Sequence, residues 1–138
     1  MKPSRVLVDT GPLVALFSRQ DAAHRSCVAA MTALEAPPLT CWPIITEAAW
    51  LLRNRRRGLA ALFDAIEQGL VELCPLDAND VGGIRERMTQ YASLNPQFAD
   101  ACLVHLAERE GVDVVFTLDR RDFSVYRTKR GKALRILP

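Results

Sequence analysis

The segment Arg5-Val-Leu-Val-Asp9-Thr-Gly-Pro12 contains an unbroken apolar run that ends in an acid and a turn. A short run of this kind, apolar at every position, predicts a buried central strand of a parallel sheet. Thr10-Gly-Pro turns the chain, and Pro12 suits the first turn of a helix expected over 13–17. Asp9 is therefore expected where a buried strand gives way to a helix.

Strands and helices alternate along the rest of the 138 residues. Further strands are expected over 39–42, 70–74 and 112–118, with a short edge strand over 133–137. Helices are expected over 21–34, from Pro43, and over 58–68, 77–91 and 99–110. This order indicates an α/β fold in which helices cover both faces of a parallel sheet. Because no repeat, low-complexity segment or linker interrupts it, residues 1–138 are predicted to form a single domain.

Composition points to an ordinary globular protein with 49% hydrophobic and 25% charged residues. The four cysteines, Cys27, Cys41, Cys74 and Cys102, form no C-x-x-C pair and are embedded in apolar stretches, as expected in a reducing cytosol. The chain opens without the pattern of a signal peptide, and no apolar run is long enough to cross a bilayer. We therefore expect a cytoplasmic protein that does not attach to membranes.

Basic residues are clustered although the net charge is only +2. One cluster is Arg53, Arg55, Arg56 and Arg57, and the other is Arg120, Arg121, Arg127, Lys129, Arg130, Lys132 and Arg135. Such clusters suit a polyanion such as RNA, and arginine, which outnumbers lysine fifteen to three, grips phosphate well. Genomic base composition explains the arginine bias equally well, and the first cluster could simply complement a helix dipole.

Four acids are expected at one edge of the sheet. Asp9 and Asp119 follow strands, while Glu47 and Asp100 are predicted in the first turns of helices. Because the helix of a βαβ unit runs back along its strand, all four should lie at the carboxyl edge, where open α/β sheets bind ligands.

Each acid also has a purely structural explanation, since an acid can cap a helix or complement its dipole by about 0.3–1 kcal/mol. Asp119-Arg-Arg-Asp122 resembles a capping box in this sense. Caps, however, have no reason to converge, and clustered carboxylates without a cation repel one another. Oxygen ligands and negative charge favour Mg²⁺ or Mn²⁺, one or two ions, with Asp9, Glu47, Asp100 and Asp119 as the expected ligands and catalytic residues.

Four segments together resemble the motifs of PIN-domain nucleases, and the closest subgroup is the VapC-type toxins of toxin–antitoxin pairs. They are Val6–Ala15, Trp42–Leu52, Ala99–Val104 and Val115–Phe123, in the family's order and at family-like spacings. The resemblance covers nearly the whole chain. Any one motif is weakly specific, whereas the ordered set is highly specific.

The resemblance implies a three-layer α/β/α PIN-like fold with a central parallel sheet, and a metal-dependent endoribonuclease that hydrolyses RNA phosphodiester bonds. It assigns the acidic quartet to Asp9, Glu47, Asp100 and Asp119, and supporting roles to Thr10, Thr117 and Asp122. It also implies a cognate antitoxin protein and a homodimer. One departure is Gln97, which stands where some relatives carry a further acid, so a five-acid site that includes this position is in doubt.

Other functions remain to be weighed. A non-catalytic RNA-binding or protein-interaction PIN module is the main alternative. A 5′ nuclease of structured DNA would need insertions for which the chain has little room. A receiver domain would need a second acid adjacent to Asp9 and a lysine at the strand end near Asp119, and both are missing. An aspartyl phosphatase would need a D-x-D motif, but Asp9 lacks the second acid. Arg120 and Arg121 could contact RNA phosphates or lie in a solvated turn. Trp50 is expected in the core.

Overall fold

The computed structural model describes residues 4–94, 97–127, 131 and 133–138. Lys129, Arg130 and Lys132 of the basic tail lie outside these ranges.

A five-stranded parallel sheet forms the centre of the described chain. Its strand order is β3-β2-β1-β4-β5. The strands are β1 (Leu7–Val8), β2 (Leu39–Thr40), β3 (Glu72–Leu73), β4 (Val114–Phe116) and β5 (Arg135–Leu137). From β1 the chain continues through β2 to β3 on one side of the sheet, and it then returns to the other side of β1 as β4. Strands β1 and β4 therefore lie side by side, with Leu7 opposite Val115. Every expected strand is confirmed, and each is shorter than its apolar run.

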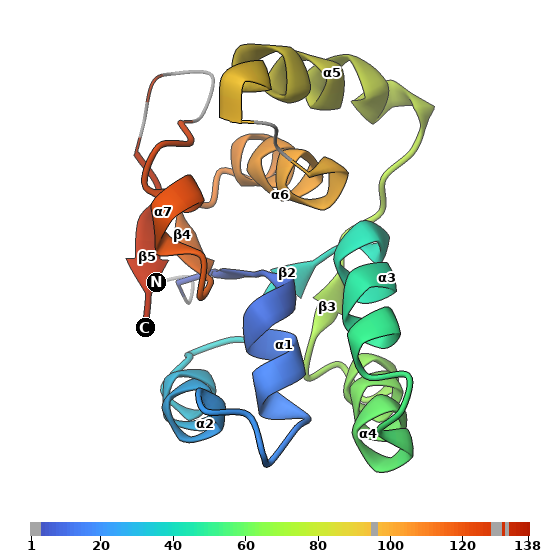
Figure 1. Ribbon diagram of the computed structural model, residues 1–138. Coiled ribbons are helices and arrows are strands. Elements are labelled where there is room, and N and C mark those ends of the chain that lie inside the picture. Colours follow the sequence, from blue (N-terminus) through green and yellow to red (C-terminus); the bar gives the residue numbers. More distant parts are fainter. Residues whose placement is uncertain (1–3, 95–96, 128–130, 132) are drawn as a thin grey trace.

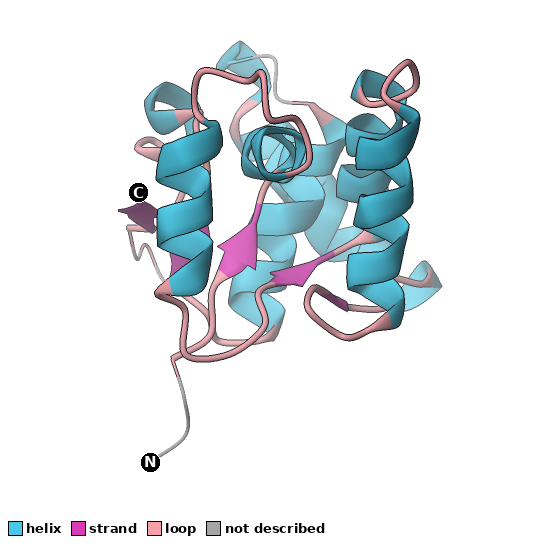
Figure 2. Ribbon diagram, turned by 90° about the horizontal axis from the view of Figure 1, so that it is seen from below, coloured by secondary structure: helices cyan, strands magenta, loops and turns pink. Residues whose placement is uncertain are grey.

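Helices cover both faces of this sheet, which confirms the three-layer α/β/α arrangement (Figure 1). Crossovers between parallel strands are right-handed, so connections that run in opposite directions place their helices on opposite faces. One face carries α1 (Thr10–Leu16), α2 (His24–Thr32), α3 (Trp42–Leu51) and α4 (Arg56–Glu67). The other carries α5 (Val81–Gln90), α6 (Phe98–Arg109) and the short α7 (Arg120–Phe123). Figure 2 shows helices both in front of and behind the strands.

The central strands supply the middle of the core. Leu7, Val8, Val115 and Phe116 are fully or almost fully buried. Helix α6 is buried along most of its length, and both α5 and α3 contact it. Helices α5 and α6 approach closely at Gly83, where a Cβ atom would lie 2.3 Å from Nδ1 of His105. A glycine is therefore required at this position for the two helices to pack.

Short helical turns lead into α5 and α6. Asp77 caps the 3₁₀ turn Ala78–Asp80, and the side chain of Asp80 accepts a hydrogen bond from the backbone N–H of Asp77 in return. The expected cap at Asp77 is therefore confirmed, although a 3₁₀ turn comes between it and α5. A second 3₁₀ turn spans Ala92–Leu94.

Trp50 differs from the sequence-based expectation. Its side chain is 64% exposed, so the prediction that it belongs to the core was wrong. It lies in the last turn of α3, and the guanidinium carbon of Arg53 lies 4.0 Å from the ring centroid. The ring is covered on one side by a cation instead of by core side chains. Among the described helices, none has the length and apolar character needed to cross a bilayer.

Candidate active site

Asp9 and Asp119 come together where the chain reverses its direction across the sheet. Asp9 directly follows β1, and Asp119 lies three residues after the end of β4. The backbone N–H of Asp9 donates to the carbonyl of Phe116 at 2.9 Å, which joins the two strand ends. Crevices outside the carboxyl ends of strands at such a switch point are the usual ligand sites of open α/β sheets.

Helices α3 and α6 contribute the other two acids of the quartet. Asp100 lies in the first turn of α6, as predicted. Glu47 is the sixth residue of α3, because that helix begins at Trp42, so the prediction of a first-turn position was wrong. Its carboxylate accepts a hydrogen bond from the hydroxyl of Thr10 at 2.9 Å. Since the dipole effect is confined to the first turn, it does not account for Glu47.

Thr117 connects Asp9 with Asp119. Its buried hydroxyl donates to Asp9 Oδ2 at 2.8 Å and accepts a hydrogen bond from the backbone N–H of Asp119 at 3.0 Å. Asp9 occupies the residue before α1, yet its side chain makes no capping hydrogen bond. Asp9 therefore does not cap α1 with its side chain. Its carboxylate is instead held by the hydroxyl of Thr117, the residue that follows β4.

Asp119 does cap a helix, and in doing so it brings Asp122 into the site. The Asp119 side chain accepts from the backbone N–H of Asp122 at 3.1 Å, at the start of α7. One carboxylate oxygen from each of Asp100, Asp119 and Asp122 lies within 4.8 Å of the others. Asp9 and Glu47 do not belong to this trio, so Asp122 stands closer to two members of the quartet than the sequence suggested.

Asp9, Glu47, Asp100, Asp119 and Asp122 are called the acidic cluster below. Their charges influence one another. Burial above all, and then the carboxylates of Asp9, Asp119 and Glu47, raise the pKa of Asp100 to about 7. Burial also raises the pKa of Asp9, the carboxylates of Glu47 and Asp119 add to that rise, and the Thr117 hydroxyl opposes it. The pKa of Asp122 is raised by burial and by the carboxylate of Asp119.

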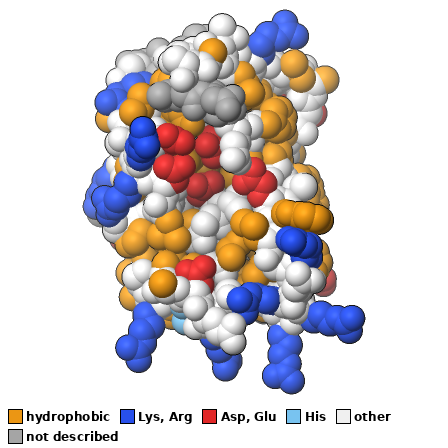
Figure 3. All heavy atoms as spheres, viewed as in Figure 1, with side chains coloured by type: hydrophobic (Ala, Val, Ile, Leu, Met, Phe, Trp, Pro, Cys, Tyr) orange, Lys and Arg blue, Asp and Glu red, His pale blue; other side chains and the backbone are white. Residues whose placement is uncertain are grey.

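No arginine, lysine or histidine forms a salt bridge with the acidic cluster within the part of the chain that the structure describes. Figure 3 shows acidic side chains gathered on one face of the molecule, with basic side chains beside them and along the lower edge. Crowded carboxylates of this kind are stabilised by a hard divalent cation with oxygen ligands. The donor set therefore fits Mg²⁺ or Mn²⁺.

Tyr126 also reaches the acidic cluster, although sequence reasoning did not single it out. Its side chain is buried, and its hydroxyl donates to Asp100 Oδ2 at 3.3 Å. The ring packs edge-to-face against Tyr91 and Phe123. Its position four residues after Asp122 was the only available signal, and a tyrosine in a polar segment is too common to be singled out.

Arg120 and Arg121 are exposed on α7, next to the acidic cluster. The guanidinium of Arg120 donates to the carbonyl of Pro138, whereas the positive charge of Arg121 partly offsets the rise in the pKa of Asp122. Their contact with RNA phosphates stays a prediction, as do the roles predicted for the acids and for Thr10 and Thr117.

Known proteins match both the sequence and the fold. The PIN domain model matches residues 6–129. Ribonuclease VapC26 of Mycobacterium tuberculosis is 27% identical over 136 residues, which covers 96% of this chain and all of that protein.

Among solved structures, M. tuberculosis VapC20, described as a Sarcin-Ricin loop cleaving toxin, superposes with a TM-score of 0.72 at 19% identity. That superposition covers 80% of this chain and 86% of VapC20. VapBC2 from Rickettsia felis, bound to a DNA fragment from its promoter, superposes with a TM-score of 0.65 at 12% identity over 96% of both chains. At these identities the two structures support the fold alone, and it is the family model, spanning most of the sequence, that establishes membership: this chain belongs to the PIN domain family.

Proposed function

We propose that this protein is a Mg²⁺- or Mn²⁺-dependent endoribonuclease and the toxin of a type II toxin–antitoxin pair, with residues 1–138 acting as one nuclease domain. The main support for the proposal is the crowding of carboxylates at the switch point, where the pKa of Asp100 is raised to about 7. Such a strong perturbation, in a cluster that forms no salt bridge with a cation among the described residues, marks a candidate functional site.

The metal ligands in this proposal come from the acidic cluster. Asp100 and Asp119, with Asp122 beside them, present carboxylate oxygens within 4.8 Å of one another. Asp9, whose carboxylate raises the pKa of Asp100, is the third proposed primary ligand. Asp122 keeps a supporting role in this proposal. The carboxylate of Asp119 raises the pKa of Asp122 and accepts a hydrogen bond from its backbone N–H. When bound, one or two Mg²⁺ or Mn²⁺ ions supply positive charge at the reacting phosphate and lower the pKa of a water.

Hydrogen bonds within the chain orient the carboxylates for this task. The Thr117 hydroxyl favours the ionised form of Asp9, and the Tyr126 hydroxyl does the same for Asp100. Glu47, held by Thr10, is the proposed residue that ligates the metal or positions the attacking water. Since neither histidine belongs to the cluster, carboxylates are the proposed proton acceptors, and the products are a 5′ phosphate and a 3′ hydroxyl.

RNA is the proposed substrate because the relatives include a protein named as a ribonuclease and one described as a Sarcin-Ricin loop cleaving toxin. Arg120 and Arg121, exposed beside the acidic cluster, would contact its phosphates. The proposed protein partners are a cognate antitoxin, supported by the similarity in fold to VapBC2, and a second copy of this chain.

Cleavage of single-stranded RNA by the purified protein tests this proposal. Reactions would contain Mg²⁺, Mn²⁺ or a chelator, with the Asp9→Asn variant beside the natural protein. We expect metal-dependent cleavage that leaves 5′ phosphates and is lost in the variant. Cleavage that persists in chelator, or in Asp9→Asn at the natural rate, would contradict the proposal.

A further inference from the structure

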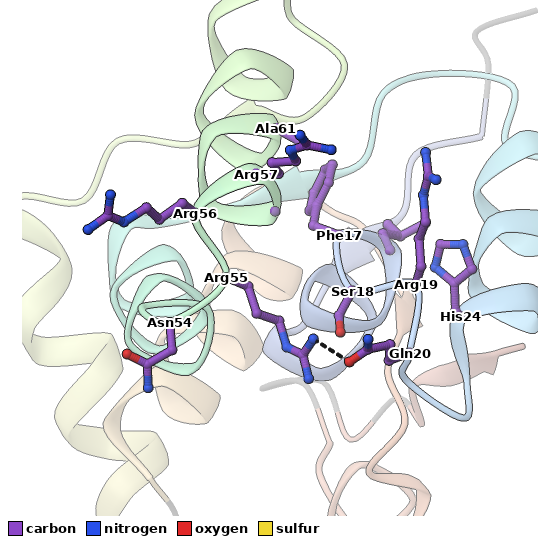
Figure 4. Close-up of a pocket in the computed structure, with 12 residues that line it drawn as sticks. Phe17, Ser18, Arg19, Gln20, His24, Asn54, Arg55, Arg56, Arg57 and Ala61 are labelled. Carbon is purple, nitrogen blue, oxygen red and sulfur yellow. Dashed lines mark hydrogen bonds between the residues drawn. The ribbon is translucent and has the colours of Figure 1, made fainter.

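A basic pocket lies at the opposite end of α1 from Asp9. It encloses about 910 Å³ between the segment after α1 and the turn that joins α3 to α4. Its lining comes from three stretches of chain: Leu16, Phe17, Ser18, Arg19, Gln20, His24, Asn54, Arg55, Arg56, Arg57, Gly58 and Ala61. Figure 4 shows Arg19, Arg55 and Arg57 around this hollow, whereas Arg56 extends away from them. The basic pocket is defined below by those first three arginines.

Tight contacts hold the walls of the basic pocket together. A Cβ atom on Gly58 would lie 2.2 Å from the carbonyl oxygen of Phe17, so α4 begins directly against the end of α1. The guanidinium of Arg55 donates to Gln20 Oε1 at 2.9 Å across the pocket (Figure 4). Nδ1 of His24 lies 2.7 Å from the carbonyl oxygen of Ala15 and forms a hydrogen bond with it. These contacts join the three stretches of chain that line the basic pocket.

The positive charge of this pocket is not neutralised by the described part of the protein. None of its lining residues is acidic, and no carboxylate among the described residues forms a salt bridge with Arg19, Arg55 or Arg57. Elsewhere Arg87 and Arg109 pair with carboxylates. Guanidinium groups without acidic partners, gathered in one hollow, attract anions, and phosphate accepts their hydrogen bonds well.

The basic pocket and the acidic cluster are connected by one helix. Helix α1 begins beside Asp9 and ends at Leu16, so its seven residues separate the two places by about 10 Å. In the orientation of Figure 3 the acidic side chains and the basic lower edge lie on the same face of the molecule. A polyanion that reaches the acidic cluster is repelled there until a cation is bound, so its attachment requires positive charge elsewhere along its path.

We propose that the basic pocket binds backbone phosphates of the RNA strand on one side of the scissile bond, an inference that rests on the proposed nuclease function. The three guanidinium groups surround the pocket without converging on one point, an arrangement that suits successive phosphates of a strand better than one free anion (Figure 4). The ring of Phe17 lies among them, and an aromatic ring in a positive groove is typical of single-strand binding.

Binding of RNA by an inactive protein tests this inference without relying on cleavage. In the Asp9→Asn background, Arg19→Ala/Arg57→Ala removes two pocket arginines whose side chains lie outside the hydrogen-bond network of the described residues, so the fold should be kept. The matched control is Arg25→Ala/Arg85→Ala, which removes the same charge from exposed sites that neither line the pocket nor belong to a basic cluster. The probe is a fluorescent random-sequence single-stranded RNA, followed by anisotropy at several salt concentrations.

The pocket variant should bind this RNA about tenfold more weakly than its parent, and the control less than about twofold. The slope of log affinity against log salt should become shallower by about 0.7 for each phosphate that the variant no longer binds. In the active protein the same pair of changes should raise KM for RNA more than it lowers kcat. Melting temperatures of both variants would show that each remains folded.

Equal binding by the pocket variant and the control would overturn the inference, as would a parent that binds no RNA. Displacement of the RNA by low concentrations of inorganic phosphate would indicate a free-anion site instead. Loss of polyglutamate binding in the pocket variant, with RNA binding kept, would indicate a surface for an acidic protein segment. If the protein cleaves RNA while the pocket variant binds normally, only the pocket assignment fails.

Discussion

Replacing Asp100 by asparagine should make the metal-free protein more stable above neutral pH. The carboxylate of Asp100 is partly buried among other carboxylates, and its pKa is raised from 3.8 to about 7. Asparagine has nearly the same shape, can still accept the hydrogen bond from Tyr126, and carries no charge. The substitution therefore removes the repulsion and the cost of burying the charge while keeping the packing.

The magnitude follows from the difference between the folded and unfolded pKa values. A carboxyl pKa raised by one is worth about 1.4 kcal/mol, which gives an upper value of about 4 kcal/mol for Asp100. Because Asp100 is partly exposed, solvent screening reduces this to about 2 kcal/mol. For a chain of this size, that corresponds to a melting temperature about 6 °C higher.

The pH dependence has a definite sign. A raised folded pKa means that the folded protein binds more protons than the unfolded one, so stability falls as pH rises between the two values. The loss begins near the unfolded pKa of 3.8 and is complete above about 7. The advantage of Asp100→Asn should therefore be small at about pH 4 and full at about pH 8.

Thermal or urea unfolding in chelator at several pH values measures this effect. The control is Asp64→Asn on the exposed face of α4, which should change stability by less than about 0.5 kcal/mol. Added Mg²⁺ should stabilise the natural protein more than Asp100→Asn. If Asp100→Asn is neutral or destabilising at about pH 8 without metal, the crowding inferred for the acidic cluster is wrong.

Three further predictions concern packing, the Thr117 bridge and proton linkage. Gly83→Ala should lower the free energy of unfolding by about 1–3 kcal/mol because its Cβ would collide with His105, whereas Gly82→Ala, with open space around it, should be neutral or stabilising. Equal unfolding curves for the two variants would refute the close approach. Thr117→Val should cost about 1–3 kcal/mol and weaken Mg²⁺ binding in calorimetry, because it removes the hydroxyl that donates to Asp9; unchanged Mg²⁺ affinity would contradict that role. Mg²⁺ binding should release more protons below about pH 7 than above it. Calorimetry in buffers of different ionisation enthalpy measures this release. Proton release that does not depend on pH would show that no carboxyl of the cluster titrates there.

Much of the fold follows from local patterns in the sequence. The apolar run before Asp9 and the run over 112–118 have the length and continuity of buried parallel strands, and both form adjacent central strands. Since strand ends and helix starts share one edge of such a sheet, the approach of Asp9, Asp100 and Asp119 could be predicted as well.

What could not be predicted depends on contacts between distant segments. Helix α3 begins at Trp42, one residue before the proline expected to open it, so Glu47 lies deeper in the helix than predicted. Trp50 is exposed because apolar character alone does not say which face of a helix another element covers. Tyr126 reaches Asp100 across 26 positions of sequence, and no local pattern encodes such a contact.

Whether the acidic cluster is a catalytic metal centre is best tested by the Mn²⁺ dependence of RNA cleavage by the natural protein, Asp100→Asn and Asp64→Asn. We predict cleavage that saturates with Mn²⁺ in the natural protein and in Asp64→Asn, and loss of cleavage in Asp100→Asn although that variant is folded. Cleavage by Asp100→Asn at the natural rate, with the same Mn²⁺ dependence, would show that the acidic cluster does not hold the catalytic metal.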